Sequence, residues 1–89
     1  MNVTPPQRIV FVDDEADIRA ANVQSLELAG LAPRAFASAE AALAVIDDDF
    51  DGVVVSDIRM PGMDGLELFR RLSERDPDLP VIQIGRAHV

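Results

Sequence analysis

The chain has 89 residues, of which 48% are hydrophobic, so it suits one small packed domain rather than a disordered tail. Sixteen acidic residues outnumber eight basic ones, and this excess argues against direct binding to DNA or RNA, because an acidic field repels phosphate backbones. The short, scattered apolar runs exclude a membrane span, and the absence of cysteine excludes disulfides and thiolate metal sites, so we expect a cytoplasmic protein.

The first half of the chain predicts two strand–helix pairs. Residues 8–12 are apolar and β-branched and end abruptly at Asp13, which predicts a buried strand. Residues 16–29 are helix formers, and Gly30 is a suitable helix stop. Residues 31–36 predict a weaker strand, and Ser38 caps a helix that runs through residue 46. The expected inward stripe of the first helix is small and rather polar: Ile18, Ala21, Asn22, Ser25, Leu26 and Ala29.

The second half continues the same alternation. Residues 52–56 form the clearest strand of the sequence, which ends at Asp57. A loop then leads to Asp64, the expected N-cap of a third helix, and a fourth strand starts at residues 79–82. One apolar face is expected on the third helix: Gly65, Leu68, Phe69 and Leu72. Continuous apolar strands in βαβαβαβ order predict an α/β fold with a parallel sheet covered on both faces.

Aspartates follow two of the predicted strands. Asp13 and Asp14 come after the first strand and Asp57 after the third, so all three would meet at one sheet edge if these strands are neighbours. Converging carboxylates repel one another, and a hard divalent cation such as Mg²⁺ would offset that repulsion. Such a site could bring a phosphoryl donor to a carboxylate nucleophile and give an aspartyl phosphate.

Three segments resemble the receiver domains of bacterial two-component response regulators. They are residues 10–15 (VFVDDE), 55–65 (VSDIRMPGMDG) and 79–82 (LPVI), in the family's order and spacing. The chain is most similar to the N-terminal receivers of sigma-54-dependent activators of the C4-dicarboxylate-transport type. The resemblance implies a flavodoxin-like (CheY-like) doubly wound parallel sheet of strand order 2-1-3-4-5, incomplete here after the fourth strand.

The resemblance also implies the role of individual residues. Asp57 would be the phosphoacceptor, and Asp14 would be a direct Mg²⁺ ligand. Asp13 would bind the ion largely through water, and the backbone carbonyl of Arg59 would complete the protein's share of the coordination. The turn at residues 61–62 would hold this loop over the site.

In this family a sensor histidine kinase supplies the phosphoryl group. The domain is then a signalling module and not an enzyme, since it assists only its own phosphorylation and dephosphorylation. We expect it to control transcription through domains further along the protein, with a possible receiver homodimer in the full-length protein. Two alternatives stay open: a stand-alone receiver that acts through protein contacts, and a degenerate, non-phosphorylated receiver used as an interaction domain.

Other interpretations of the acidic residues have less support in the sequence. A lone Asp at a strand end is commonly a helix cap, and we treat Asp64 in that way. Residues 47–52 imitate the start of a calcium loop, but its twelfth position falls on Ile58 instead of Glu. A magnesium-dependent phosphatase with an Asp nucleophile needs a second acid two residues later, where Arg59 follows Asp57.

The chain departs from the receiver pattern toward its end. It contains no lysine, although the family has one after the fifth strand, and Gly85 aligns with the family's Thr or Ser at the end of the fourth. Residues 84–89 match a translation of a common sequencing-library adapter. We therefore expect a short flexible leader at residues 1–7, receiver sequence at 8–82 and a non-native tail at 83–89, in which His88 has no role. Without the remaining elements, apolar surface would lie open.

Overall fold

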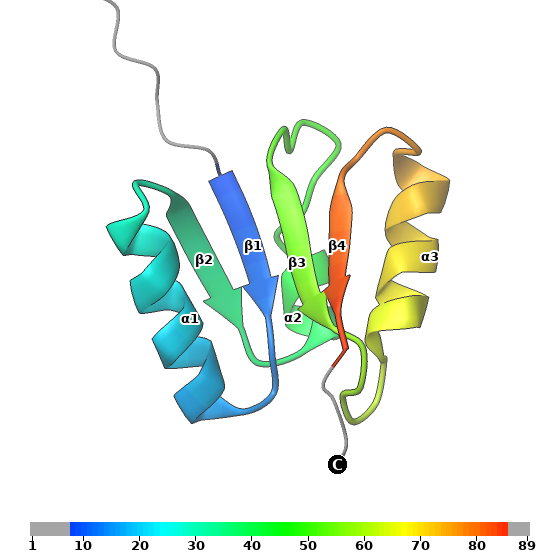
Figure 1. Ribbon diagram of the computed structural model, residues 1–89. Coiled ribbons are helices and arrows are strands. Elements are labelled where there is room, and N and C mark those ends of the chain that lie inside the picture. Colours follow the sequence, from blue (N-terminus) through cyan, green and yellow to red (C-terminus); the bar gives the residue numbers. More distant parts are fainter. Residues whose placement is uncertain (1–7, 86–89) are drawn as a thin grey trace, which may run out of the picture.

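The computed structural model describes residues 8–85, which form a four-stranded parallel sheet and three helices (Figure 1). The strand order β2-β1-β3-β4 confirms the predicted flavodoxin-like doubly wound topology through the fourth strand. The expected leader at residues 1–7 and residues 86–89 of the expected tail lie outside the described residues. The elements follow in this order: β1 (Arg8–Val12), α1 (Ala16–Leu28), β2 (Ala32–Phe36), α2 (Ala39–Leu43), β3 (Val53–Asp57), α3 (Gly65–Arg75) and β4 (Val81–Ile84).

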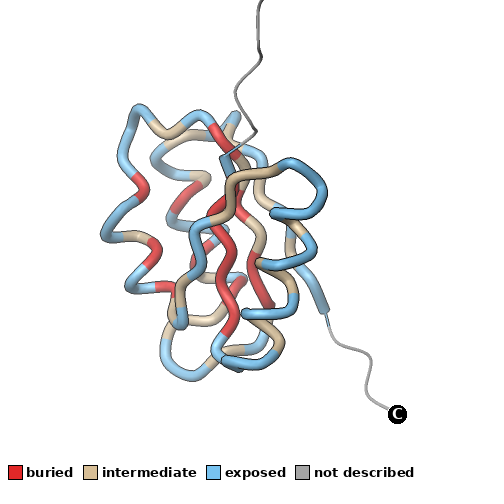
Figure 2. The backbone as a smooth tube through the Cα atoms, turned by 90° about the vertical axis from the view of Figure 1, so that its left-hand side faces the viewer, coloured by how far each residue is buried: buried red, intermediate tan, exposed pale blue. Residues whose placement is uncertain are grey.

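The hydrophobic core lies on the face of the sheet that α2 and α3 cover. Alternate residues of β1 and β3 point to this face, and Val12 and Val54 are fully buried there. Figure 2 shows buried stretches of backbone along the central strands. The whole cluster comes from four elements and the residue Ile46: Val10, Val12, Ala39, Ala42, Ile46, Val54, Leu68 and Leu72. Stability therefore depends mainly on this one layer.

Helix α1 covers the other face of the sheet, next to β1 and β2 (Figure 1). Ile18, Asn22 and Leu26 are partly buried, as expected, but the other three members of the predicted inward stripe (Ala21, Ser25 and Ala29) are exposed. That part of the prediction is wrong, and no residue of α1 is fully buried. The physical reason is that α1 packs mainly against β2, with less contact to β1, so only a narrow line of its surface is covered.

Helix ends agree well with the predicted caps. The Ser38 hydroxyl accepts a hydrogen bond from the Ala41 amide at 3.1 Å. Gly30 follows α1 with a φ of 85°, and hydrogen bonds from its own amide and that of Leu31 close a Schellman turn. Helix α2 is shorter than expected, because it ends at Leu43 rather than at residue 46.

Helix α3 begins after Asp64, whose carboxylate accepts a hydrogen bond from the Glu67 amide at 2.9 Å. Leu68 and Leu72 are buried as predicted, whereas Phe69 is 42% exposed, so the expected apolar face is narrower than the sequence indicated. On the outer side of α3, Arg70 lies 2.6 Å from carboxylates of Glu67 and Glu74, and the hydrogen bond that Arg70 donates to Glu67 raises the pKa of Arg70.

Strand β4 differs most from the expected boundaries. It starts at Val81 rather than at residue 79 and continues to Ile84, so it includes two residues of the expected tail. Gln83 pairs with Ser56, and Ile84 pairs with Asp57. Ile82 is 54% exposed and Ile84 is 43% exposed, which confirms the expectation of open apolar surface on this part of the sheet.

Replacing the core residue Leu68, a Leu68→Ala change, should lower the free energy of unfolding by about 2–5 kcal/mol, because it opens a cavity in a fully buried layer. The matched control is Leu28→Ala on α1, where the side chain is 82% exposed. That change should stay within about 0.5 kcal/mol. Urea unfolding in sucrose, which favours the folded state, provides the measurement. Equal losses in the two variants would contradict the assignment of the core.

Candidate functional site

Three carboxylates meet at the carboxyl edge of the sheet. Asp13 and Asp14 directly follow β1, and Asp57 is the last residue of β3. The parallel register pairs Val12 with Ser56, so both strands end at the same level. One oxygen from each carboxylate lies within 4.8 Å of the others. Asp13 and Asp57 are buried and Asp14 is exposed, so the convergence that the sequence predicted is confirmed.

Asp13 is held by hydrogen bonds from three directions. Its amide donates to the Phe36 carbonyl at 3.1 Å, which continues the β1–β2 ladder past the end of the strands. Its carbonyl accepts from the Arg19 guanidinium at 2.9 Å, and its carboxylate accepts from the Glu15 amide at 2.9 Å. The loop that carries the first two carboxylates is therefore tied to both β2 and α1.

The third carboxylate is held by the chain that follows it. The Arg59 amide donates to the Asp57 carboxylate at 3.3 Å, and the Ile58 amide donates to the Ile84 carbonyl at 3.3 Å. The Ser56 hydroxyl, which is fully buried, donates to the Asp57 carbonyl at 2.9 Å. These contacts place Arg59 beside the site, and its carbonyl stays a predicted ligand.

The loop after Asp57 returns to the sheet through glycines. Gly62 adopts a φ of 73°, which suits the turn expected at residues 61–62. The Gly65 amide donates to the Ile58 carbonyl at 2.8 Å, and the Gln83 side-chain amide donates to the Gly65 carbonyl. A Cβ at Gly65 would lie only 2.4 Å from the Asp57 carbonyl oxygen. The start of α3 thus packs directly on the backbone of the predicted phosphoacceptor.

Sequence reasoning missed three residues that support the site: Arg19, Gly65 in its contact with Asp57, and Gln83. Gly65 had a possible signal, because a glycine directly after a helix cap suggests that another backbone approaches closely. Arg19 and Gln83 had none, because their partners are backbone carbonyls that any residue could supply.

The donor set fits a hard divalent cation. The three converging side-chain ligands are carboxylate oxygens, and Mg²⁺ is commonly bound by one or two carboxylates together with water and phosphate oxygens. Two of the three carboxylates are buried close together, and a cation would relieve their mutual repulsion. A small pocket of about 210 Å³ opens beside them, lined by Phe11, Asp13, Ile18, Asn22, Asp57 and Ile84.

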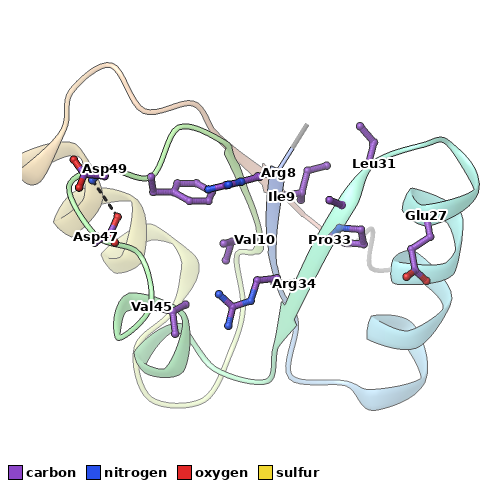
Figure 3. Close-up of a pocket in the computed structure, with 12 residues that line it drawn as sticks. Arg8, Ile9, Val10, Glu27, Leu31, Pro33, Arg34, Val45, Asp47 and Asp49 are labelled. Atoms are coloured by element: carbon purple, nitrogen blue, oxygen red, sulfur yellow. Dashed lines mark hydrogen bonds between the residues drawn. The ribbon is translucent and has the colours of Figure 1, made fainter. Parts of the chain in front are cut away.

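A larger pocket, of about 710 Å³, lies at the opposite end of the sheet (Figure 3). Arg8 and Ile9 line it from the start of β1, Pro33 from β2, and Asp47 and Asp49 from the connection between α2 and β3. It contains none of the three converging carboxylates. Pocket volume therefore does not identify the candidate site in this protein.

A carboxylate cluster beyond the ends of β1 and β3 lies where the strand order reverses, which is the usual ligand position in open parallel sheets. Fold and site together define a small doubly wound α/β module with a carboxylate cluster that could hold a divalent cation. Residues 9–89 match the response regulator receiver domain family. The chain belongs to that family, as the sequence motifs predicted, and it is a receiver domain of the two-component type.

The similar proteins include transcriptional regulators. The chain is 55% identical over 76 residues to the C4-dicarboxylate transport transcriptional regulatory protein DctD of Rhizobium meliloti, covering 85% of this chain and 16% of that protein. It is 44% identical over 77 residues to the DNA-binding transcriptional regulator NtrC of Salmonella typhimurium, covering 86% and 16%. The chain therefore spans about a sixth of the length of these relatives.

Solved receiver structures show the same fold. FixJ-N superposes with a TM-score of 0.83 at 38% identity, covering 92% of this chain and 66% of FixJ-N. The response regulator TrrA of Thermotoga maritima, solved in complex with Mg²⁺ and BeF, superposes with a TM-score of 0.83 at 30% identity, covering 89% and 69%. Within residues 8–85, no helix has the length and apolar character needed to cross a membrane.

A Gly65→Ala change should lower the free energy of unfolding by about 1–3 kcal/mol, because the added Cβ collides with the Asp57 carbonyl. The expected sign is informative, since alanine is normally the better helix former. The control is Gly85→Ala, whose Cβ would meet only the Ile58 side chain at 3.6 Å. Urea unfolding of both variants in sucrose measures the difference. A Gly65→Ala variant as stable as Gly85→Ala would show that the close approach is not a constraint.

Proposed function

We propose that Asp57 accepts a phosphoryl group from a sensor histidine kinase, with Mg²⁺ bound by Asp13, Asp14, Asp57 and the Arg59 carbonyl. The observation that carries this proposal is the convergence of three carboxylate oxygens within 4.8 Å at the switch point of the sheet. Membership of the receiver family and the Mg²⁺–BeF complex of TrrA support it.

The proposed reaction is a direct phosphoryl transfer. A carboxylate oxygen of Asp57 attacks the phosphorus of a phosphohistidine on the kinase and forms a new P–O bond. The P–N bond breaks, and the departing imidazole nitrogen keeps the electron pair and takes up a proton. The product is an acyl phosphate on Asp57. Catalysis of such a transfer requires mainly positioning and charge stabilisation, so a small module with no general base can assist it.

Different residues of the chain have different roles in this transfer. Bound Mg²⁺ would neutralise charge on the phosphoryl oxygens. Asp13 and Asp14 hold the ion from one strand end, and the Arg59 amide orients the Asp57 carboxylate through its hydrogen bond. Burial of Asp57 to 5% exposure limits access of water to the carboxylate that becomes the acyl phosphate.

The proposed output is control of transcription through regions beyond this chain. DctD and NtrC are named as transcriptional regulators, and this chain matches only 16% of each. A cytoplasmic location and a receiver homodimer in the full-length protein complete the proposal. The Asp-rich surface of this segment makes it a protein-contacting module and not a DNA-binding one, because it would repel phosphates.

The main alternative is a degenerate receiver that binds partners without phosphorylation. One observation favours it: Gly85, which follows β4, has no hydroxyl to contact a phosphoryl group. The three intact aspartates favour phosphorylation. A stand-alone receiver that acts through protein contacts would share the chemistry and differ only in its output.

Incubation of the 89-residue chain with phosphoramidate and Mg²⁺, in sucrose to favour the folded state, should add one hydroxylamine-sensitive phosphoryl group. Asp57→Asn should remove the modification, because the amide is not a nucleophile of this kind. Asp64→Asn is the matched control, since Asn also caps a helix and Asp64 lies outside the carboxylate group. Intact-mass spectrometry reads the result. An unmodified wild-type chain would support the degenerate receiver instead.

Mg²⁺ should stabilise the fold by binding only the folded chain, by about 2.7 kcal/mol when its free concentration is about 100 times its Kd. Removal of Mg²⁺ with a chelator should reverse this gain. Asp14→Asn should abolish most of it, whereas Asp48→Asn, on an exposed residue outside the carboxylate group, should leave it intact. Urea unfolding with and without Mg²⁺ provides the measurement. An equal gain in both variants would place the bound ion elsewhere.

A further inference from the structure

Arg19 of α1 reaches into the loop that carries Asp13 and Asp14, where its guanidinium donates to the Asp13 carbonyl at 2.9 Å. The geometry points to Arg19 as a positioning residue for the divalent cation: its guanidinium holds the main chain of Asp13 so that the carboxylates of Asp13 and Asp14 face Asp57. This inference rests on the proposed Mg²⁺ site and adds a residue outside its ligand set.

Arg19 spans the loop from the first turn of α1. Its own amide donates to the Glu15 carbonyl at 2.9 Å, which is the first hydrogen bond of the helix. Its guanidinium then reaches back and donates to the Asp13 carbonyl at 2.9 Å. One residue therefore joins the end of β1 to the start of α1 by both its backbone and its side chain.

The bond to Asp13 restricts the peptide that links the two carboxylates. The Asp13 amide is already fixed on β2 through the Phe36 carbonyl, and its carboxylate accepts from the Glu15 amide. With the carbonyl held by Arg19, the peptide between Asp13 and Asp14 cannot rotate without breaking a charge-assisted hydrogen bond. Asp14 is exposed, so little else restrains its direction.

Two physical effects of Arg19 on cation affinity have opposite signs. A positive charge near the site repels Mg²⁺, so removing it by substitution would strengthen binding if charge alone mattered. A fixed ligand loop strengthens binding, so removing the hydrogen bond would weaken it. Groups that orient metal ligands typically change affinity by about 10–100-fold when they are lost. The sign of the change therefore separates positioning from simple electrostatics.

The experiment compares Arg19→Met, Arg19→Lys and Arg71→Met in the full chain, in sucrose to keep every variant folded. Arg71 is an exposed arginine of α3 whose guanidinium lies 3.8 Å from Glu67, so Arg71→Met removes the same charge away from the loop. Mg²⁺ affinity is measured by calorimetry, and hydrogen exchange of the Glu15 amide with solvent is measured by NMR without Mg²⁺. Neither readout depends on phosphorylation.

Arg19→Met should weaken Mg²⁺ binding by about 10–100-fold and speed exchange of the Glu15 amide. Arg71→Met should leave both nearly unchanged, and Arg19→Lys should restore most of the affinity, because an ammonium group can still donate to the Asp13 carbonyl. If Arg19→Met binds Mg²⁺ as well as Arg71→Met does, or more tightly, the positioning role is wrong. If Arg19→Met fails to fold even in sucrose, Arg19→Lys becomes the test. Faster hydrogen exchange of the Glu15 amide at an unchanged Mg²⁺ affinity would then also overturn the role.

Different results would overturn the proposed function and the role of Arg19. A wild-type chain that binds no Mg²⁺ overturns both the proposed function and this inference. A wild-type chain that binds Mg²⁺ and is phosphorylated, with an Arg19→Met variant of equal affinity, overturns only the role of Arg19.

Discussion

The parallel register between β1 and β3 is the constraint on which the site depends. Because Val12 pairs with Ser56, the next residue along each chain segment lies at the same edge, and Asp13 and Asp57 become buried neighbours. Like charges at this spacing oppose the fold. The surrounding hydrogen bonds to Asp13 and Asp57 hold the carboxylates in place against that repulsion, which leaves an arrangement that a divalent cation would stabilise.

The two faces of the sheet contribute unequally to the molecule. The layer beneath α2 and α3 contains the fully buried side chains, whereas α1 has no fully buried residue. Helix α1 contributes to the site through Arg19 rather than to the core through its apolar residues. Helix α1 therefore mainly supports the carboxylates, whereas α3 both buries apolar surface and packs on Asp57.

Membership of the receiver family and the departures from its pattern concern different parts of the site. The acidic half, formed by Asp13, Asp14 and Asp57, is complete and lies in the arrangement that the family motifs predicted. The position that the resemblance aligns with a phosphoryl-contacting Thr or Ser differs, because Gly85 offers no hydroxyl. The proposed cation binding and the proposed phosphoryl transfer can therefore be measured independently.

Local sequence patterns were enough to predict the strand–helix order, the aspartates at two strand ends and the caps at Ser38 and Asp64, because each depends on a few adjacent residues and their intrinsic geometry. The burial of α1 and the end of β4 could not be predicted in this way, since both depend on which segments pack nearby. The same holds for the contacts of Arg19 and Gln83 with backbone carbonyls, because every residue offers a carbonyl and no side-chain pattern marks the one that is used.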